Sequence, residues 1–211
     1  MLFLHNTSRV DDEPYPRLLQ EKGFGGFPSL CFMDADGNVL ITQGQRSVPA
    51  FEESRVKLQG LMDVRTQIAA LGDGKKEEKA KLERSLLLAE IDLQIPKAED
   101  AKKRAEALGL GKDDMAIVDR YAFGAELRAL RGKTRELGAD AVAAQVAEMA
   151  KAGKLPTKDT EAWFWQMSLT YAAKNADGEL GQKAFDALSK LSIPEPMKKR
   201  LEAMLDQSKG K

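Results

Sequence analysis

The residue types that most often carry out chemistry are scarce in this chain, and each lacks the partners it would need. Cys31 is the only cysteine and His5 the only histidine among 211 residues. A single thiol excludes an intrachain disulfide, a CxxC redox pair and a cysteine-rich zinc site. A His-based metal site or a Ser-His-Asp triad would depend on one imidazole. The phosphate-binding patterns GxxxxGKS/T and GxGxxG are absent from the sequence.

Cys31 has two interpretations, a redox thiol or a buried core residue. It lies in the apolar stretch of residues 29–33, and no Lys, Arg or His stands beside it in the sequence. Because basic neighbours are what lower the pKa of a thiol, we interpret Cys31 as a small apolar core residue. His5 could be a ligand or a base, but it ends a short apolar run and is interpreted as a solvated residue at a strand end.

Two further groups of residues could bind a ligand. Asp34 and Asp36 have the spacing that begins a calcium loop, but the later acidic ligands are missing, so turn formation explains them better. Aromatic and apolar residues also crowd one predicted helix, namely Trp163, Phe164, Trp165, Met167 and Tyr171. This cluster predicts a helical core, with a peptide-binding groove as the alternative.

The composition limits the class of partner. Lys and Arg number 33, Asp and Glu also number 33, and hydrophobic residues make up 43% of the chain. A chain without net charge has no overall field to attract nucleic acid or an anionic membrane, so neither is expected as a partner. No apolar run approaches the length of a membrane span. No cofactor or metal is expected, and a protein or peptide is the expected partner.

Residues 1–70 carry the strand and turn patterns of the chain. Apolar runs at residues 2–4, 29–33 and 39–41 predict strands, and Asp36-Gly37 between the last two predicts a hairpin because the turn needs positive φ. A helix is predicted to begin near Asp11 and to stop at Gly23. With the helix that follows, the expected order is strand, helix, strand, strand, helix.

Residues 71–211 predict an all-helical domain with short connections and antiparallel neighbours. Thr157 or Asp159 is expected to cap the helix that carries Trp163 and Trp165. The stretch AWFWQMSLTYAAKNADGELGQKAFDALSKLSIP has a weak similarity to a tetratricopeptide helix pair. The gap between Tyr171 and Ala184 is longer than in the usual repeat, and no clean period recurs.

The stretch KGFGGFPSLCFMDADGNVL, with its preceding helix and following hairpin, resembles the carboxy-terminal half of a thioredoxin-like domain. Gly23, Gly26, Phe27, Pro28 and Ser29 match the loop that precedes a central strand in that family. The resemblance implies a cis peptide bond at Pro28. It also implies that Phe27, Pro28 and Ser29 offer backbone groups to an extended peptide. The fold class expected is therefore α/β plus all-α, a partial thioredoxin-like β-α-β-β-α unit followed by an antiparallel helical array.

The family's first core strand and its CxxC helix are not in this sequence. Three explanations stay open: the chain is a fragment of a longer protein, the two flanking strands pair directly, or a second chain supplies the strand and forms an oligomer. The chain as given is expected to be cytoplasmic, and extracytoplasmic if an amino-terminal segment is missing.

Two functions are expected from these observations. The first is a thioredoxin-like protein without its own CxxC, which is non-catalytic in this chain or a fragment of a thiol-disulfide oxidoreductase. The alternative is a helical protein-interaction scaffold with a thioredoxin-like docking platform. A single-cysteine peroxide-responsive protein is a third and weaker hypothesis, because nothing beside Cys31 in the sequence favours a thiolate.

Overall fold

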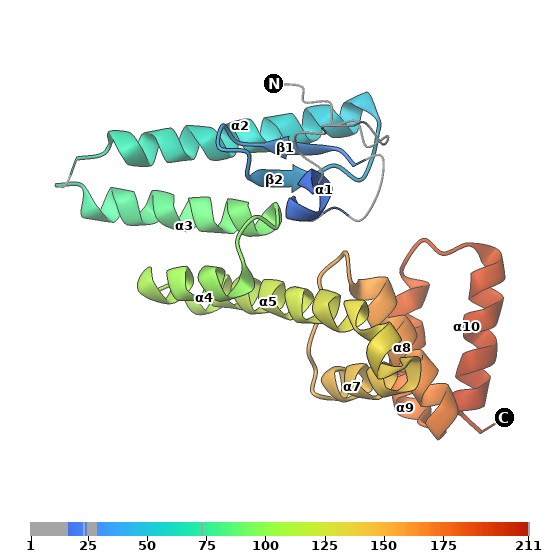
Figure 1. Cartoon of the computed structure of the whole chain (residues 1–211). Helices are drawn as coiled ribbons and strands as arrows, with labels where there is room; N and C mark the ends of the chain where they lie inside the picture. Colours follow the sequence, from blue (N-terminus) through green and yellow to red (C-terminus); the bar gives the residue numbers. More distant parts are fainter. Residues whose placement is uncertain (1–16, 23, 25–28, 73, 211) are drawn as a thin grey trace, which may run out of the picture. The chain divides into compact units, whose positions relative to one another are not determined.

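The computed structural model describes residues 17–22, 24, 29–72 and 74–210 of the chain (Figure 1). The chain divides into two compact units, Met1–Lys97 and Ala98–Lys211. This boundary is not the one at residue 70 that the sequence suggested, because the helix that follows residue 70 packs against the helix that precedes it. The predicted residues Phe27, Pro28 and His5 and the predicted strand at residues 2–4 lie outside the described residues.

The first unit contains a short β-hairpin and a pair of long helices. Its elements are α1 (Leu18–Glu21), β1 (Cys31–Met33), β2 (Val39–Thr42), α2 (Val48–Ala70) and α3 (Lys76–Asp92). Helices α2 and α3 run antiparallel and side by side (Figure 1). Between them, Arg65 Nη2 donates a 2.8 Å hydrogen bond to Oε1 of the buried Glu90. An ion pair with one buried partner fixes how the two helices align, because shifting the pair would leave a buried charge without its partner.

The hairpin forms where the Asp-Gly pattern predicted it. β1 pairs antiparallel with β2, with Cys31 opposite Thr42 and Phe32 opposite Ile41. Gly37 has a φ of 79°, which a residue without a side chain adopts at little cost. Asp34 Oδ1 accepts hydrogen bonds from the backbone N–H groups of Asp36 (3.0 Å) and Asn38 (2.8 Å). The interpretation of these aspartates as turn residues is therefore confirmed.

The hairpin is anchored on the first turns of α2. Ser47 caps this helix, its Oγ accepting the Ala50 N–H at 3.4 Å. The ring of Phe32 lies 6.0 Å from the ring of Phe51, and Ser54 Oγ donates a 2.7 Å hydrogen bond to Gln43 Oε1. These contacts supply the packing against a helix that a two-stranded hairpin needs for stability in water.

The predicted fold class is wrong for the part of the chain that the structure describes. That part is mostly helical, and its two strands pair only with each other, so it shows no β-α-β-β-α unit. The physical reason is that a turn pattern such as Asp-Gly specifies a local hairpin and nothing about a larger sheet. Membership of a larger sheet depends on strands distant in sequence, and in this unit the long helix α2 packs against the hairpin instead.

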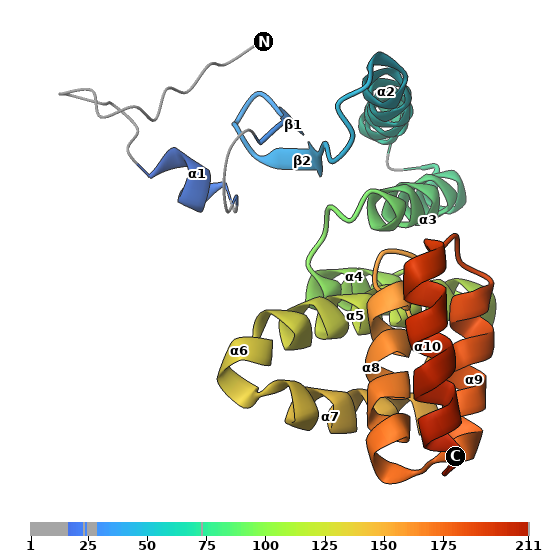
Figure 2. The same cartoon turned by 90° about the vertical axis from the view of Figure 1, so that its right-hand side faces the viewer.

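The second unit is built from helices alone in its described residues, as the sequence predicted for this region. Its elements are α4 (Ala98–Ala107), α5 (Lys112–Gly132), α6 (Thr134–Leu137), α7 (Ala139–Lys151), α8 (Glu161–Asn175), α9 (Gly178–Ser189) and α10 (Glu195–Ser208). Helices α8, α9 and α10 lie side by side, and α7 runs back from α6 toward α8 and packs against it (Figure 2). The helix α6 was not predicted from the sequence, because four residues are too few for a periodic pattern.

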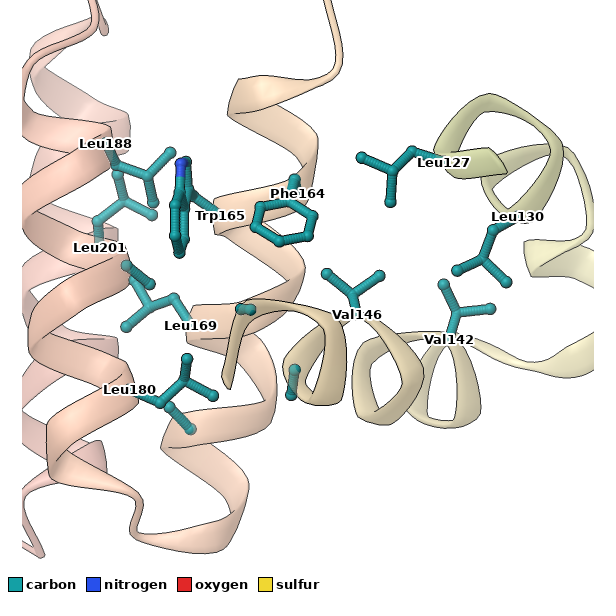
Figure 3. Close-up of a cluster of buried hydrophobic side chains, with 14 of the residues drawn as sticks. Leu127, Leu130, Val142, Val146, Phe164, Trp165, Leu169, Leu180, Leu188 and Leu201 are labelled. Carbon is teal, nitrogen blue, oxygen red and sulfur yellow. The ribbon is translucent and has the colours of Figure 1, made fainter. Parts of the chain in front are cut away.

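The core of this unit is centred on α8. Phe164 points toward Leu127 and Val146, whereas Trp165 lies toward Leu188 and Leu201 (Figure 3). The Phe164 ring meets the Trp165 ring edge-on at 4.8 Å and the Phe123 ring edge-on at 5.8 Å. Adjacent residues on a helix are separated by about 100° around its axis, so two neighbouring rings can reach two different sets of helices. The aromatic cluster is therefore mainly a core, as predicted.

Replacing Phe164 with Ala should lower the free energy of unfolding by about 3–5 kcal/mol, because it empties a fully buried site that joins three helices. Urea denaturation followed by circular dichroism measures the change. Leu155→Ala is the control, since Leu155 is exposed in the same unit and should cost far less. Equal losses for the two variants would contradict the assigned core.

Candidate functional site

Cys31 is partly exposed, so its interpretation as a buried core residue is corrected. A two-stranded hairpin covers its side chains less than a central strand of a large sheet would. Partial burial raises the pKa of the Cys31 thiol, and the nearby Lys22 ammonium opposes this effect without overcoming it. Lys22 is nine positions away in the sequence and is placed there by a 2.6 Å hydrogen bond from its Nζ to the Gly37 carbonyl. The thiol is thus protonated at neutral pH, which does not favour nucleophilic chemistry.

Of the predicted peptide-binding loop, the structure describes only Ser29. Ser29 is partly buried and lies two residues before β1, whereas Phe27 and Pro28 lie outside the described residues. Among the described residues there is no cluster of three or more His, Cys, Asp or Glu side chains that could hold a metal ion. Within the same residues, no helix is both long enough and apolar enough to span a membrane.

The cap predicted for α8 is wrong. Thr160 occupies the N-cap position without a side-chain bond to the helix, so neither Thr157 nor Asp159 is the capping residue. The hydroxyls of Thr157 and Thr160 instead lie 2.9 Å apart, and Asp159 Oδ2 accepts a 2.8 Å hydrogen bond from Arg128 Nη1. The polar residues before α8 therefore hold the preceding loop to α5, a role that sequence spacing alone could not show.

A groove of about 870 Å³ lies in the second unit, between α4, α5 and the loop that joins α7 to α8. We call that loop, residues 152–160, the strap. The apolar part of the groove is lined by Ala98, Ala116, Ile117, Ala122, Phe123 and Leu155. Ile117 is 48% exposed and Leu155 is 61% exposed, so both of these large apolar side chains are accessible.

Most of the charged residues that line the groove are engaged with one another or with the backbone. Lys102 Nζ lies 3.3 Å from Asp119 Oδ1, and Lys154 Nζ lies 3.4 Å from Glu126 Oε2. Lys154 Nζ also lies 4.9 Å from the centre of the Phe123 ring, within the range of a cation–π contact. These pairs neutralise most of the charge locally, so the groove offers apolar contact rather than a binding site for a charged group.

Sequence reasoning missed this groove because its walls come from three separate elements. One signal was present: Leu155 lies between Lys154 and Pro156 in a connection between two helices. A large apolar residue in a polar, proline-containing loop is unexpected unless something covers it or binds it. The sequence instead suggested a peptide-binding groove at the aromatic residues of α8, yet Trp165 is buried and Trp163 is only partly exposed.

A second, smaller hollow of about 410 Å³ lies in the first unit, beside β2 and the ends of α2 and α3. Its lining is more polar, with Ser54, Lys57 and Asp92 among its residues, and Lys57 Nζ lies 3.8 Å from Asp92 Oδ2. Ser54 already donates its hydroxyl to Gln43, and none of these groups has the nucleophile-and-base arrangement of a catalytic site.

Comparisons of the chain with protein-family models, with curated proteins and with solved structures find no match. The resemblance to thioredoxin-like proteins therefore stays a prediction.

The chain should not accelerate the reduction of insulin by dithiothreitol, because one thiol with a raised pKa cannot complete attack and resolution within one chain. Turbidity from precipitated insulin measures the rate, with Cys31→Ser as the matched control. Alkylation of Cys31 by iodoacetamide should also shift to higher pH in the folded protein than in urea. Acceleration that disappears in Cys31→Ser would contradict this prediction.

The pair formed by Asp159 and Arg128 should stabilise the strap above the usual pKa range of aspartate and lose its effect at lower pH. Burial raises the pKa of Asp159, but hydrogen bonds from Thr157 and Arg128 and the Arg128 charge lower it by more. Because the folded-state pKa is below the unfolded value, the stabilisation is complete above the unfolded pKa. It disappears as pH falls through the folded value.

Asp159→Asn should therefore cost about 0.5–1 kcal/mol near neutral pH, the range of a partly exposed ion pair, and nothing in strong acid. Urea denaturation at a series of pH values measures the difference. In an Arg128→Gln background the cost of Asp159→Asn should shrink, and a cost that persists unchanged would show that the pair is not its source.

Proposed function

We propose that the second unit, Ala98–Lys211, is a non-catalytic protein-interaction module that binds an apolar peptide segment in its groove. The observation that carries this proposal is the pair of accessible apolar side chains, Ile117 on α5 and Leu155 on the strap, which line the same hollow. Helical arrays of this kind bury one continuous core and leave a surface suited to peptides.

The energy of binding would come from covering those two side chains and the Phe123 ring beside them. Burying one large aliphatic side chain contributes about 1.5–3 kcal/mol. Small residues line the rest of the apolar surface, namely Ala98, Ala116 and Ala122, so a partner's backbone can approach closely. Two anchors on separate elements also favour a partner that presents at least two apolar side chains.

The charges that line the groove support an uncharged contact segment. Two of the basic groups, Lys102 and Lys154, already face the carboxylates of Asp119 and Glu126. The third, Arg120, donates from Nε to the Pro156 carbonyl at 2.9 Å. A phosphate group or nucleic acid would have to displace these contacts, and the chain as a whole has no net charge to attract one.

The lining of the groove also supports binding rather than catalysis. Among the residues that line it there is no hydroxyl, thiol or imidazole side chain. The carboxylates of Asp119 and Glu126 are each paired with a lysine, Lys102 at 3.3 Å and Lys154 at 3.4 Å, and neither is paired with a nucleophile. A module that recognises a peptide needs neither kind of group.

Binding can be tested with a defined probe on the full chain. The probe is a fluorescein-labelled helical peptide of roughly 15 residues without net charge, with leucines at positions i, i+4 and i+7. Fluorescence anisotropy should show binding, and Ile117→Asp or Leu155→Asp should each weaken it about tenfold or more because each removes one apolar anchor.

Met197→Asp is the matched control, since Met197 is 42% exposed on α10 and does not line the groove. It should leave the affinity unchanged. A scrambled peptide of the same composition should bind more weakly. The proposal fails if neither groove variant changes the affinity, or if the scrambled peptide binds equally well.

A further inference from the structure

The strap is held along one row of side chains on α5. Arg120, Gly124 and Arg128 are spaced four residues apart, so they lie on the same face of this helix. Arg120 Nε donates to the Pro156 carbonyl at 2.9 Å, and Arg128 Nη1 donates to Asp159 Oδ2 at 2.8 Å. Between these two hydrogen bonds, Gly124 lies against Thr157.

Gly124 allows a contact that any larger residue would prevent. A Cβ atom at this position would lie 2.5 Å from Thr157 Oγ1 and 2.7 Å from Thr157 Cγ2, and both distances are too short for real atoms. Thr157 has little freedom to turn away, because it is β-branched and its hydroxyl lies 2.9 Å from that of the buried Thr160. The absence of a side chain at Gly124 is thus a requirement of space.

The contact lies next to the groove in the chain. Pro156 and Thr157 directly follow Leu155, which lines the groove together with Gly153 and Lys154. Fixing Pro156 and Thr157 on α5 therefore fixes the wall that carries Leu155. Lys154 extends the same attachment on the other side, through its contacts with Glu126 and Phe123.

We propose that Gly124 is the positioning residue of the groove. Because it has no side chain, the strap can pack directly on α5, and this packing fixes the position of Leu155. This inference rests on the proposed function for its biological meaning, but the position of the strap can be measured without any ligand. Arg120 and Arg128, on either side of Gly124, also hold the strap: Arg120 bonds to the strap backbone and Arg128 bonds to Asp159.

The test substitutes Gly124→Ala in the full chain and compares it with Gly132→Ala. Gly132 lies on the same helix, and a Cβ added there would meet nothing within 4 Å. Alanine is the better helix former at both positions, so propensity alone cannot speed exchange in Gly124→Ala, and faster exchange reports the strap contact. We expect amide hydrogen exchange in residues 153–158 to quicken about tenfold in Gly124→Ala, the effect of a moderate overpacking strain, and to stay unchanged in Gly132→Ala.

A second substitution separates displacement of the strap from general damage. Thr157→Ala removes both atoms that an alanine at position 124 would strike, so Gly124→Ala with Thr157→Ala should exchange more slowly than Gly124→Ala alone. Exchange in α9 and α10 should not change in any of these variants. If Gly124→Ala exchanges like Gly132→Ala, or if Thr157→Ala gives no recovery, the inference is overturned.

A fluorophore at position 155 reports the wall itself. In a Cys31→Ser background, Leu155→Cys provides a single thiol for acrylodan, because the chain has only one native cysteine. Adding Gly124→Ala should shift the emission, and adding Gly132→Ala should not. Equal spectra would overturn the inference. A strap that moves as expected while the peptide probe never binds would count against the proposed function alone.

Discussion

Two aromatic rings on neighbouring residues of α8 determine how the second unit is built. Phe164 packs toward α5 and α7, and Trp165 packs toward α9 and α10 (Figure 3). Because one helix contributes to both sides of the core, α8 is the element around which the others must arrange themselves. The ring of Phe123 continues this packing onto α5, and its other contact, with Lys154, lies at the groove. Core and groove therefore share Phe123, so a substitution in the core can alter the groove.

Helix α5 has to satisfy two partners with different faces. Phe123, Leu127 and Leu130 belong to the core, whereas the row of Arg120, Gly124 and Arg128 holds the strap. A side chain at position 124 would collide with the strap, and a shorter side chain on the core face would leave a cavity.

The sequence could predict those features of the structure that neighbouring residues determine, and not those that depend on distant parts of the chain. Apolar spacing predicted the long helices, and Asp36-Gly37 predicted the hairpin, because both depend on neighbouring residues. The larger sheet, the cap of α8 and the burial of Cys31 were predicted wrongly, since each depends on what packs against it. The groove and the Lys22 contact near Cys31 bring together residues distant in sequence. A four-residue spacing of arginine, glycine and arginine is visible in the sequence, but it has no meaning until a loop is known to lie on it.

The antiparallel pair of α2 and α3 is unevenly packed along its length. Its buried residues are Leu58 and Leu61 on α2 and Leu86, Leu87, Glu90 and Ile91 on α3, all well away from the ends where Ala70 and Lys76 approach each other. A segment with so few buried neighbours opens at a lower free energy than the rest of its unit. Evolution could lengthen or trim this end by matching turns on both arms with little effect on the hairpin, which makes it a natural place for insertions or fused tags.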